Sequence, residues 1–444
     1  MLKALLFFTV FYVVNELHLP VQTGIPAVAP ANILFVLVVL AMRGKSETLD
    51  AASVRGMLRE PLIYFYAALT FSFLLSELRS TDRFMEDLTF FKNGLFYPLF
   101  YFLYLRCRQD EKTTRQLIIW IMVIAAVAGL EGLREGLDYG FGKYNPFRRA
   151  SGPFGSDWKN ANRAGVFYAM FMPMFLALAL FLRGRGSLKW RVAAVGGCVL
   201  LAGGTLATYS RQSYFLVLLS FALLLLRKNI IIAAIVGISL VSLAGYLPDS
   251  VFQRVEETQQ QDNKAHGEVD TSTASRWEIW AGAMGMLREH PIGVGFHKFS
   301  FEIGNYAPAY KGFDAHNFYV LTLAESGPQG LFTFLLLIYT LFRLTSYLRH
   351  NAPPGDHETR ALTLGFTIAT LCMAMGGIYG TPTLEGSVMT PYWALCGLLE
   401  RYVHLKTQNS GRATDGEPVT YEPPMAERFP LAAHILPGRK ARRV

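Results

Sequence analysis

The sequence predicts an all-α polytopic membrane protein with about twelve transmembrane helices and a small helical cap outside the membrane. Three observations lead to this prediction. Of the 444 residues, 52% are hydrophobic and only 17% are charged, against about 25% charged in ordinary soluble domains. The hydrophobic residues come in blocks of the length that a helix needs to cross about 30 Å of hydrocarbon. The mean hydropathy of +0.28 averages these blocks with the polar loops between them.

The apolar blocks divide the chain into four parts. The blocks centre on residues 2–16, 30–42, 61–77, 87–105, 116–133, 163–182, 191–208, 212–226, 229–246, 329–345, 361–378 and 388–402. Residues 1–246 hold the first nine expected spans, with an outer loop at 134–163, and residues 316–404 hold the last three. Between them, residues 247–315 contain TASRWEIWAGAMGMLREH, whose apolar residues recur at helical spacing and predict the helical cap. Residues 405–444 are expected to form a disordered, basic cytoplasmic tail.

Lysine and arginine gather at every second junction between spans, which sets the orientation because positive residues favour the cytoplasmic side. These residues are Arg43, Lys45, Arg55, Arg59, Arg106, Arg108, Lys112, Arg115, Arg183, Arg185, Lys189, Arg191, Arg227, Lys228, Arg343 and Arg349. The outer junctions 17–29 and 379–387 contain neither residue. We therefore expect a bacterial inner-membrane protein with both termini in the cytoplasm and outer loops facing the periplasm. Orientation in a bilayer explains the net charge of +9 better than a nucleic-acid partner does.

The sequence contains no pattern for a metal, a nucleotide or a disulfide framework. Cys107, Cys198, Cys372 and Cys396 lie in or beside apolar blocks, without a CxxC pair or histidines at ligand spacing. A P-loop, a Rossmann glycine fingerprint and an HExxH motif are also missing from the sequence. We expect no metal site, no cofactor and no nucleic-acid partner.

Several arginines fall on the predicted outer side, against the charge rule. Arg211 stands at the outer end of a span, where it could clamp an anion bidentately or extend its side chain into lipid headgroups. Taken alone, Arg276 and Arg288 on the loop helix could be solvated surface charges. Arg149 and Arg163 belong to the earlier outer loop. If these arginines converge on one outer cavity, they would suit a diphosphate.

His316 stands where the polar loop re-enters the membrane, in FDAHNFYVLTLAESGPQGLF. A histidine at such a boundary could be an interfacial hydrogen-bonding residue or a general base. Glu325 follows nine residues later, and the breaker cluster Gly327, Pro328 and Gly330 predicts a short helix that ends before a new span begins. A broken helix at membrane depth is tolerated only where it is buried in protein or lines water, which favours a functional site.

His316 and Asn317, followed after nine residues by Gly327 and after two more by Gly330, resemble the histidine motif of bacterial O-antigen ligases. These enzymes belong to a wider family with O-antigen polymerases and bacterial O-oligosaccharyltransferases. Four further segments resemble the family pattern in order and approximate spacing: RRASGPFGSDWKNANRAG at 148–165, Ser210-Arg211-Gln212, Ser275-Arg276-Trp277 and HPIGVGF at 290–296.

The resemblance implies a metal-independent, inverting glycosyltransferase with a GT-C-like membrane-embedded architecture. It would transfer glycan from undecaprenyl diphosphate to lipid A-core at the periplasmic face, among membrane lipids. Arg211 and Arg276 would hold the donor diphosphate, and His316 would be the general base. The further residues expected to contact substrate are Arg288, Arg163, Arg149 and Asn317. An O-antigen polymerase, a protein O-oligosaccharyltransferase and, from another class, an anion or lipid transporter remain as alternatives.

Overall fold

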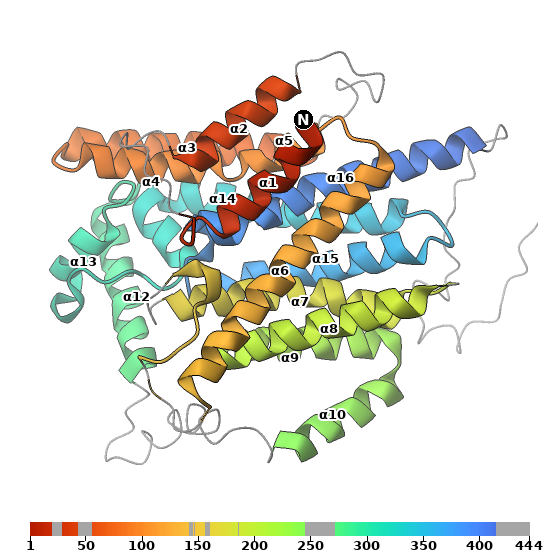
Figure 1. Ribbon diagram of the computed structural model, residues 1–444. Helices are drawn as coiled ribbons and strands as arrows, with labels where there is room; N and C mark the ends of the chain where they lie inside the picture. Colours follow the sequence, from red (N-terminus) through yellow and green to blue (C-terminus); the bar gives the residue numbers. More distant parts are fainter. Residues whose placement is uncertain are drawn as a thin grey trace, which may run out of the picture.

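The computed structural model describes residues 1–19, 29–42, 56–141, 145, 147–155, 160–184, 186–244 and 271–413, and every regular element within them is a helix (Figure 1). The helices are α1 (Leu2–Val14), α2 (Pro30–Ala41), α3 (Arg59–Arg79), α4 (Phe84–Phe96), α5 (Leu99–Leu105), α6 (Glu111–Tyr139), η1 (Gly152–Phe154), α7 (Ala161–Phe181), α8 (Ser187–Ala207), α9 (Arg211–Lys228), α10 (Ile230–Ala244), α12 (Thr271–Glu289), α13 (Phe299–Tyr306), η4 (Pro308–Tyr310), α14 (Phe318–Asn351), α15 (His357–Gly376), η5 (Pro382–Leu384) and α16 (Gly386–Ala413).

Each of the twelve predicted apolar runs coincides with a helix or a pair of helices. The run at 87–105 is divided into α4 and α5 at Pro98, which lacks the backbone N–H that would continue the helix. Within the described residues, six helices are long and apolar enough to cross a membrane: α3, α6, α7, α8, α14 and α15. The chain is thus a multi-pass membrane protein. That it crosses the membrane twelve times stays a prediction.

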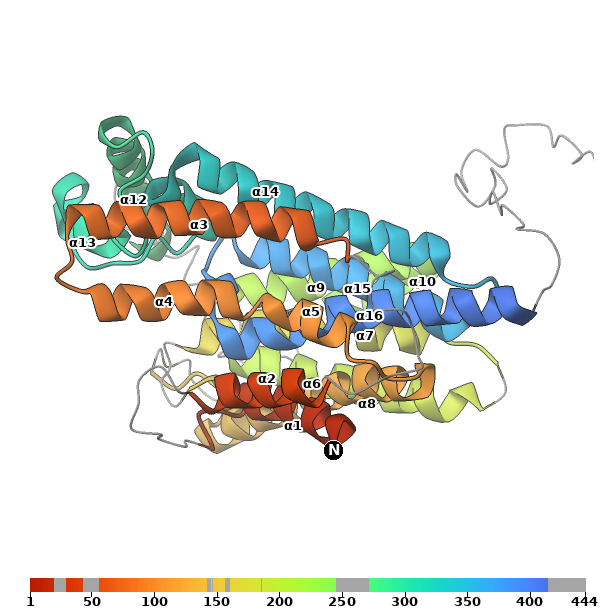
Figure 2. The same ribbon diagram turned by 90° about the horizontal axis from the view of Figure 1, so that it is seen from above.

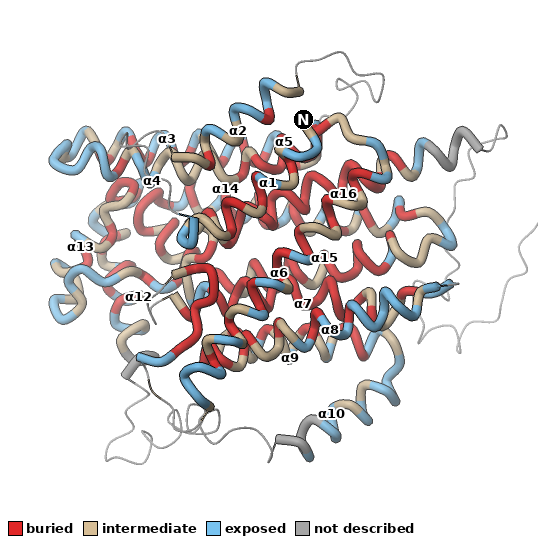
Figure 3. The backbone as a smooth tube through the Cα atoms, in the orientation of Figure 1, coloured by how far each residue is buried: buried red, intermediate tan, exposed pale blue. Residues whose placement is uncertain are grey.

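Helix α7 forms the centre of the bundle. Its apolar window is 83% buried, against 39% for α8 and for α14, so protein surrounds α7 while the other two present a large surface to lipid. Figure 3 shows this contrast, with buried backbone along α7, α14, α15 and α16 and exposed backbone along α10. The two views agree that α12 and α13 lie together at one end of the bundle, beside the start of α14 (Figure 1 and Figure 2).

Helix α14 is broken at Gly327, as the glycine and proline cluster predicts. Gly327 has φ 68° and ψ −174°, values far from a helix. The rings of Phe318 and Phe334 nevertheless lie only 4.7 Å apart between centroids. In a straight helix their sixteen-residue separation would span about 24 Å. The first part of α14 therefore folds back beside the second part, and His316 precedes this short re-entrant segment.

The carbonyl groups released by the break are satisfied by residues 290–298, a segment that we call the strap. The N–H groups of Val294 and Gly295 donate to the carbonyls of Ala324 and Glu325, at 2.9 and 3.0 Å. The Ser72 hydroxyl on α3 also donates to the Glu325 carbonyl, at 3.0 Å. Buried backbone groups need such partners, so the strap is part of what holds the re-entrant segment in place.

The strap is itself anchored to α4 by a buried carboxylate. One oxygen of Asp87 lies 2.7 Å from the His297 ring nitrogen, the other accepts from the Lys298 ammonium at 2.7 Å, and the Asp87 side chain is 0% exposed. Directly after the strap, at the start of α13, the N–H of Phe299 donates to the Glu325 carboxylate at 3.1 Å. These contacts connect α4, the strap and the re-entrant segment into one body.

Replacing Gly293 by alanine should destabilise the protein, because it disturbs the contact between the strap and the re-entrant segment. Gly293 has φ +96°, and an added Cβ would lie 2.3 Å from the Glu325 carbonyl oxygen. The matched control is Gly312→Ala, because Gly312 has φ +85° but no heavy atom within 4 Å of the added Cβ. Both variants carry about 1–2 kcal/mol of left-handed strain, and Gly293→Ala adds about 1–3 kcal/mol for overpacking. Thermal unfolding in detergent should give the lower Tm for Gly293→Ala. Equal Tm values would contradict the close contact between the strap and the re-entrant segment.

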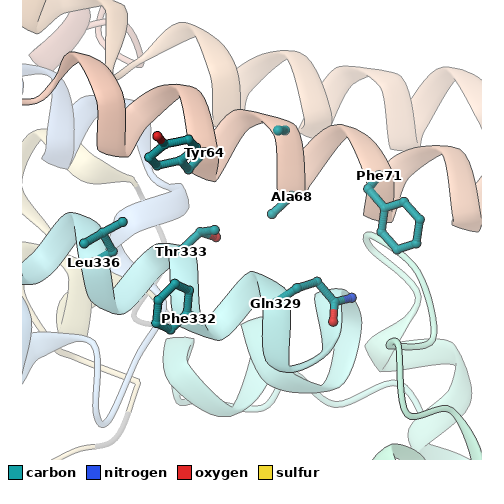
Figure 4. Close-up of a pocket in the computed structure, with 8 residues that line it drawn as sticks. Tyr64, Ala68, Phe71, Gln329, Phe332, Thr333 and Leu336 are labelled. Atoms are coloured by element: carbon teal, nitrogen blue, oxygen red, sulfur yellow. The ribbon is translucent and has the colours of Figure 1, made fainter.

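An open apolar groove of about 420 Å³ lies between α3 and α14, on the membrane-spanning part of the bundle. Figure 4 shows its lining, which comes from these two helices: Tyr64, Ala67, Ala68, Phe71, Gln329, Phe332, Thr333 and Leu336. Because its lining is mainly apolar and aromatic, the groove suits a hydrocarbon chain better than a polar ligand.

One helix crosses a predicted segment boundary. Helix α16 continues to Ala413, beyond the predicted start of the tail at 405. Lys406 holds this part of α16 against the starts of α6 and α15, because its ammonium pairs with Glu111 and Asp356, at 2.9 and 3.1 Å. The rest of the predicted tail, 414–444, and the polar stretch 245–270 lie outside the described residues.

Candidate active site

The segments that carry Arg211 and His316 contact the end of α15 and its connection to α16, residues 376–385. Next to Arg211, the Gln212 amide donates to the Gly376 carbonyl at 2.7 Å. Close to His316, the N–H of Phe318 donates to the Gly377 carbonyl at 2.8 Å. Three segments that are far apart along the chain therefore meet at one connection.

Arg276 reaches the same connection from α12. Its guanidinium carbon lies 5.5 Å from the centroid of the Tyr379 ring. One helical turn further on, the Trp280 indole N–H donates to the carbonyl of Ala315 at 2.9 Å. Ala315 immediately precedes His316, so α12 is fixed directly against the backbone of the predicted base.

The backbone of His316 has a conformation that few residues other than glycine adopt. Its φ is 49°, in the left-handed region. Its neighbours hold it there, because the Ala315 carbonyl accepts from Trp280 and the Asn317 side chain accepts from the N–H groups of Tyr319 and Val320. The His316 side chain itself is exposed. Strained backbone at an accessible polar side chain is typical of functional positions.

The surroundings of His316 favour its neutral form. The pKa of His316 is lowered from its ordinary value, first because surrounding protein desolvates the ring and also because the positive charge of Arg276 opposes protonation. The carboxylate of Asp314 acts in the opposite direction. Although the ring is accessible, protein atoms surround it closely enough to disfavour charge. At neutral pH the imidazole is therefore free to accept a proton.

Replacing Asp314 by asparagine should move the acidic limb of the activity profile to lower pH. A base with a lowered pKa stays neutral below pH 6.5 and loses activity as the pH falls through that pKa. Asp314 raises the pKa of His316, so its neutralisation lowers that pKa further. The check is kcat/KM against pH for the wild type, Asp314→Asn and Asp82→Asn, in which an exposed acid between α3 and α4 is neutralised. A limb that does not move, or that moves to higher pH, would count against His316 as the base.

Arg149 and Arg163 lie in the earlier outer loop and make different contacts. Arg149 is 7% exposed, and its guanidinium donates to the Thr208 carbonyl at 2.8 Å and to the Asn162 side chain at 2.6 Å. It thus braces the turn that precedes Arg211, which favours a positioning role over the substrate contact predicted from sequence. Arg163 pairs with Glu385 at 2.6 Å and belongs to the rim of the connection.

Arg288 and Asn317 also lie in positions that the sequence did not specify. Arg288 is exposed on α12, twelve residues beyond Arg276, which is about 18 Å along a helix. Contact of Arg288 with substrate stays a prediction. Asn317 is the N-cap of α14 and uses its side-chain oxygen on two backbone N–H groups. Its contacts make it a positioning residue for the re-entrant segment.

The connection adds site residues that sequence reasoning missed. The Thr381 hydroxyl donates to the Asp314 carboxylate at 3.2 Å. Glu385 has a raised pKa, first because it is buried and also because Asp314 is nearby, while Arg163 opposes the shift. The sequence contained a weak indication that this junction belongs to the site. The junction falls on the predicted outer side and contains Tyr379 and Glu385 without any lysine or arginine.

A metal site was not predicted, and the structure adds no candidate. Within the described ranges, no group of three or more His, Cys, Asp or Glu side chains is arranged to hold an ion. The four cysteines are buried and unpaired. Independence from metal remains a prediction for experiment.

Comparison with known proteins finds a family that part of the chain resembles. No curated protein matches the chain significantly. Residues 196–335 match the family model described as O-antigen ligase. The matched segment contains Arg211, Arg276 and His316, together with the strap and the re-entrant segment. Residues 196–335 are therefore similar to the O-antigen ligase family.

Proposed function

We propose that the protein is an O-antigen ligase. It transfers a glycan from undecaprenyl diphosphate to lipid A-core at the periplasmic face of the inner membrane and completes lipopolysaccharide. The observation that supports the proposal is that the segments carrying Arg211, Arg276 and His316 contact the α15–α16 connection, through Gln212, the Arg276 guanidinium and Phe318. The family match supports glycan transfer as the type of reaction.

The two arginines supply the electrostatic part of the proposed reaction. A glycosyl diphosphate already has a good leaving group, so catalysis must stabilise the negative charge that grows on the departing phosphate. Guanidinium groups grip phosphate oxygens bidentately and stay protonated. Arg211 and Arg276 therefore neutralise this charge in our proposal, without a metal ion.

His316 supplies the proton transfer. Its neutral imidazole accepts the proton of the acceptor hydroxyl while that oxygen attacks the anomeric carbon of the donor sugar. The bond between the anomeric carbon and the diphosphate oxygen breaks, and its electron pair leaves with the polyprenyl diphosphate. This single displacement inverts the anomeric centre and leaves an imidazolium, which returns its proton to water. The lowered pKa of His316 supports the neutral starting state.

The lipid parts of both substrates need apolar surfaces close to the site. The groove between α3 and α14 offers one such surface, beside the break at Gly327 (Figure 4). In this proposal, grooves between the spans hold the hydrocarbon tails and the sugars meet above them at the connection.

An assay with the purified protein distinguishes the ligase from its nearest alternatives. It is given a polyprenyl-diphosphate glycan together with lipid A-core, a second donor molecule or an acceptor protein, each with and without chelator. The proposal expects glycan on lipid A-core and equal rates with chelator. A longer lipid-linked polymer would identify a polymerase, and a glycosylated protein would identify an O-oligosaccharyltransferase. Substrate movement without transfer would favour a transporter, and loss of activity with chelator would refute the metal-free mechanism.

A further inference from the structure

Two aromatic side chains beside the candidate active site are unusually exposed. Trp277 on α12 is 60% exposed, and Tyr379 on the α15–α16 connection is 45% exposed. Large aromatic surfaces are usually buried, and exposed groups of them mark ligand, partner or membrane contacts. They flank Arg276, since Trp277 is its neighbour in sequence and Tyr379 lies under its guanidinium.

A third aromatic residue joins these two side chains into one cluster. The Trp280 ring lies 5.2 Å from the Trp277 ring and 6.4 Å from the Tyr379 ring, between centroids. Because Trp280 donates to the Ala315 carbonyl, the cluster is fixed to the residue before His316. The exposed faces of Trp277 and Tyr379 are therefore held at a set position relative to the proposed base.

We propose that Trp277 and Tyr379 form a platform on which a pyranose ring of the substrate stacks. One face of a pyranose presents several C–H groups, which pack favourably against the electron-rich face of an aromatic ring. The inference rests on the proposed function, because it assigns the ring to a sugar that takes part in the transfer. Arg276 binds the diphosphate beside Tyr379, so the platform receives a sugar close to the bond that changes.

The surroundings of the platform match a saccharide in charge and polarity. Asp314 and Thr381 form a hydrogen-bonded pair at the same connection, and both side chains can bond to sugar hydroxyl groups. Glu278 follows Trp277 on α12 and is exposed. This combination of aromatic faces, carboxylates and a guanidinium fits a glycosyl diphosphate better than it fits a hydrocarbon chain.

Aromatic residues also collect at membrane surfaces, where they contact lipid headgroups. The position of the cluster argues for the sugar instead. The Trp280 indole N–H donates to the Ala315 carbonyl, next to His316, and the Arg276 guanidinium lies over one face of the Tyr379 ring. A lipid anchor would not need to contact Arg276 and the residue that precedes His316. The effect of replacing a lipid anchor would also not depend on which saccharide is present.

The platform is tested with Trp277→Ala and Tyr379→Ala against the conservative variants Trp277→Phe and Tyr379→Phe. We expect the alanine variants to raise KM by about 3- to 10-fold while kcat changes less, and the phenylalanine variants to stay near the wild type. The matched control is Tyr339→Ala, since Tyr339 is also 60% exposed but lies on the membrane-spanning part of α14. Unchanged KM values for both alanine variants, or an equal change in Tyr339→Ala, would overturn the platform.

Separate KM values for donor and acceptor identify the source of the stacked sugar. A rise for lipid A-core alone assigns the platform to the acceptor, and a rise for the polyprenyl-diphosphate glycan alone assigns it to the donor. Binding is also measured without transfer, by titrating lipid-free core oligosaccharide and lipid-free donor glycan and following tryptophan fluorescence. A Trp277-dependent change with either saccharide supports the platform even if no transfer occurs. Transfer with unaffected KM and no Trp277-dependent change refutes the platform alone.

Discussion

Replacing His316 by alanine is expected to lower the rate of glycan transfer by about 10² to 10⁴-fold, the usual contribution of a positioned base. The acceptor hydroxyl would then have to lose its proton to water. In cells the lipid-linked glycan should accumulate while lipid A-core stays bare. Purified protein gives the rate directly, from glycan attached to lipid A-core in single-turnover conditions.

Two variants separate chemistry from structure at this position. His316→Asn keeps a side chain that tolerates the left-handed backbone and can form hydrogen bonds, but it cannot act as a base. We expect it to be as inactive as His316→Ala, with an unchanged Tm. His350→Ala removes an exposed histidine at the other end of α14 and should transfer glycan normally. Activity restored by asparagine would show that His316 serves as a hydrogen-bonding residue instead.

Replacing Arg276 by alanine is expected to lower kcat by about 10² to 10³-fold, as the loss of one group that stabilises transition-state charge usually does. Arg211→Ala should have an effect of the same order. Lysine at either position should recover only part of the rate, because a compact ammonium cannot grip two phosphate oxygens at once. Rates at saturating donor isolate this effect from weaker donor binding.

A second result is particular to Arg276. Its charge lowers the pKa of His316, so Arg276→Ala should raise that pKa and move the acidic limb of the activity to higher pH. This shift is opposite in sign to the one expected for Asp314→Asn. Arg343→Ala, an exposed arginine near the far end of α14, is the control and should change neither rate nor profile. If Arg276 were only a solvated surface charge, its removal would resemble that control.

The helices could be predicted because their signals are local. Apolar blocks of the right length mark the helices, and the cluster at Gly327 to Gly330 marks the break in α14. Even the helix of the cap could be derived from the spacing of its apolar residues, as α12 confirms. Each of these features depends on neighbours within a few turns.

The arrangement of the site could not be predicted in the same way, because it depends on contacts between distant segments. Its residue type and predicted side suggest that Arg149 contacts substrate, but its contacts with the Thr208 carbonyl and the Asn162 side chain could not be read from the sequence. The HPIGVGF segment was recognisable as a motif. Its hydrogen bonds to the Ala324 and Glu325 carbonyls, however, form only when the chain folds back at the break in α14. The role of Tyr379 likewise becomes visible only when α12 is set against the α15–α16 connection.

The most direct test of the central claim is a cryo-EM structure of the His316→Ala protein with an intact polyprenyl-diphosphate glycan. We predict that the diphosphate lies between the guanidinium groups of Arg211 and Arg276, with the anomeric carbon of the first sugar facing position 316. Density for the diphosphate elsewhere, or guanidinium groups turned toward lipid or the opposite end of the bundle, would contradict the account.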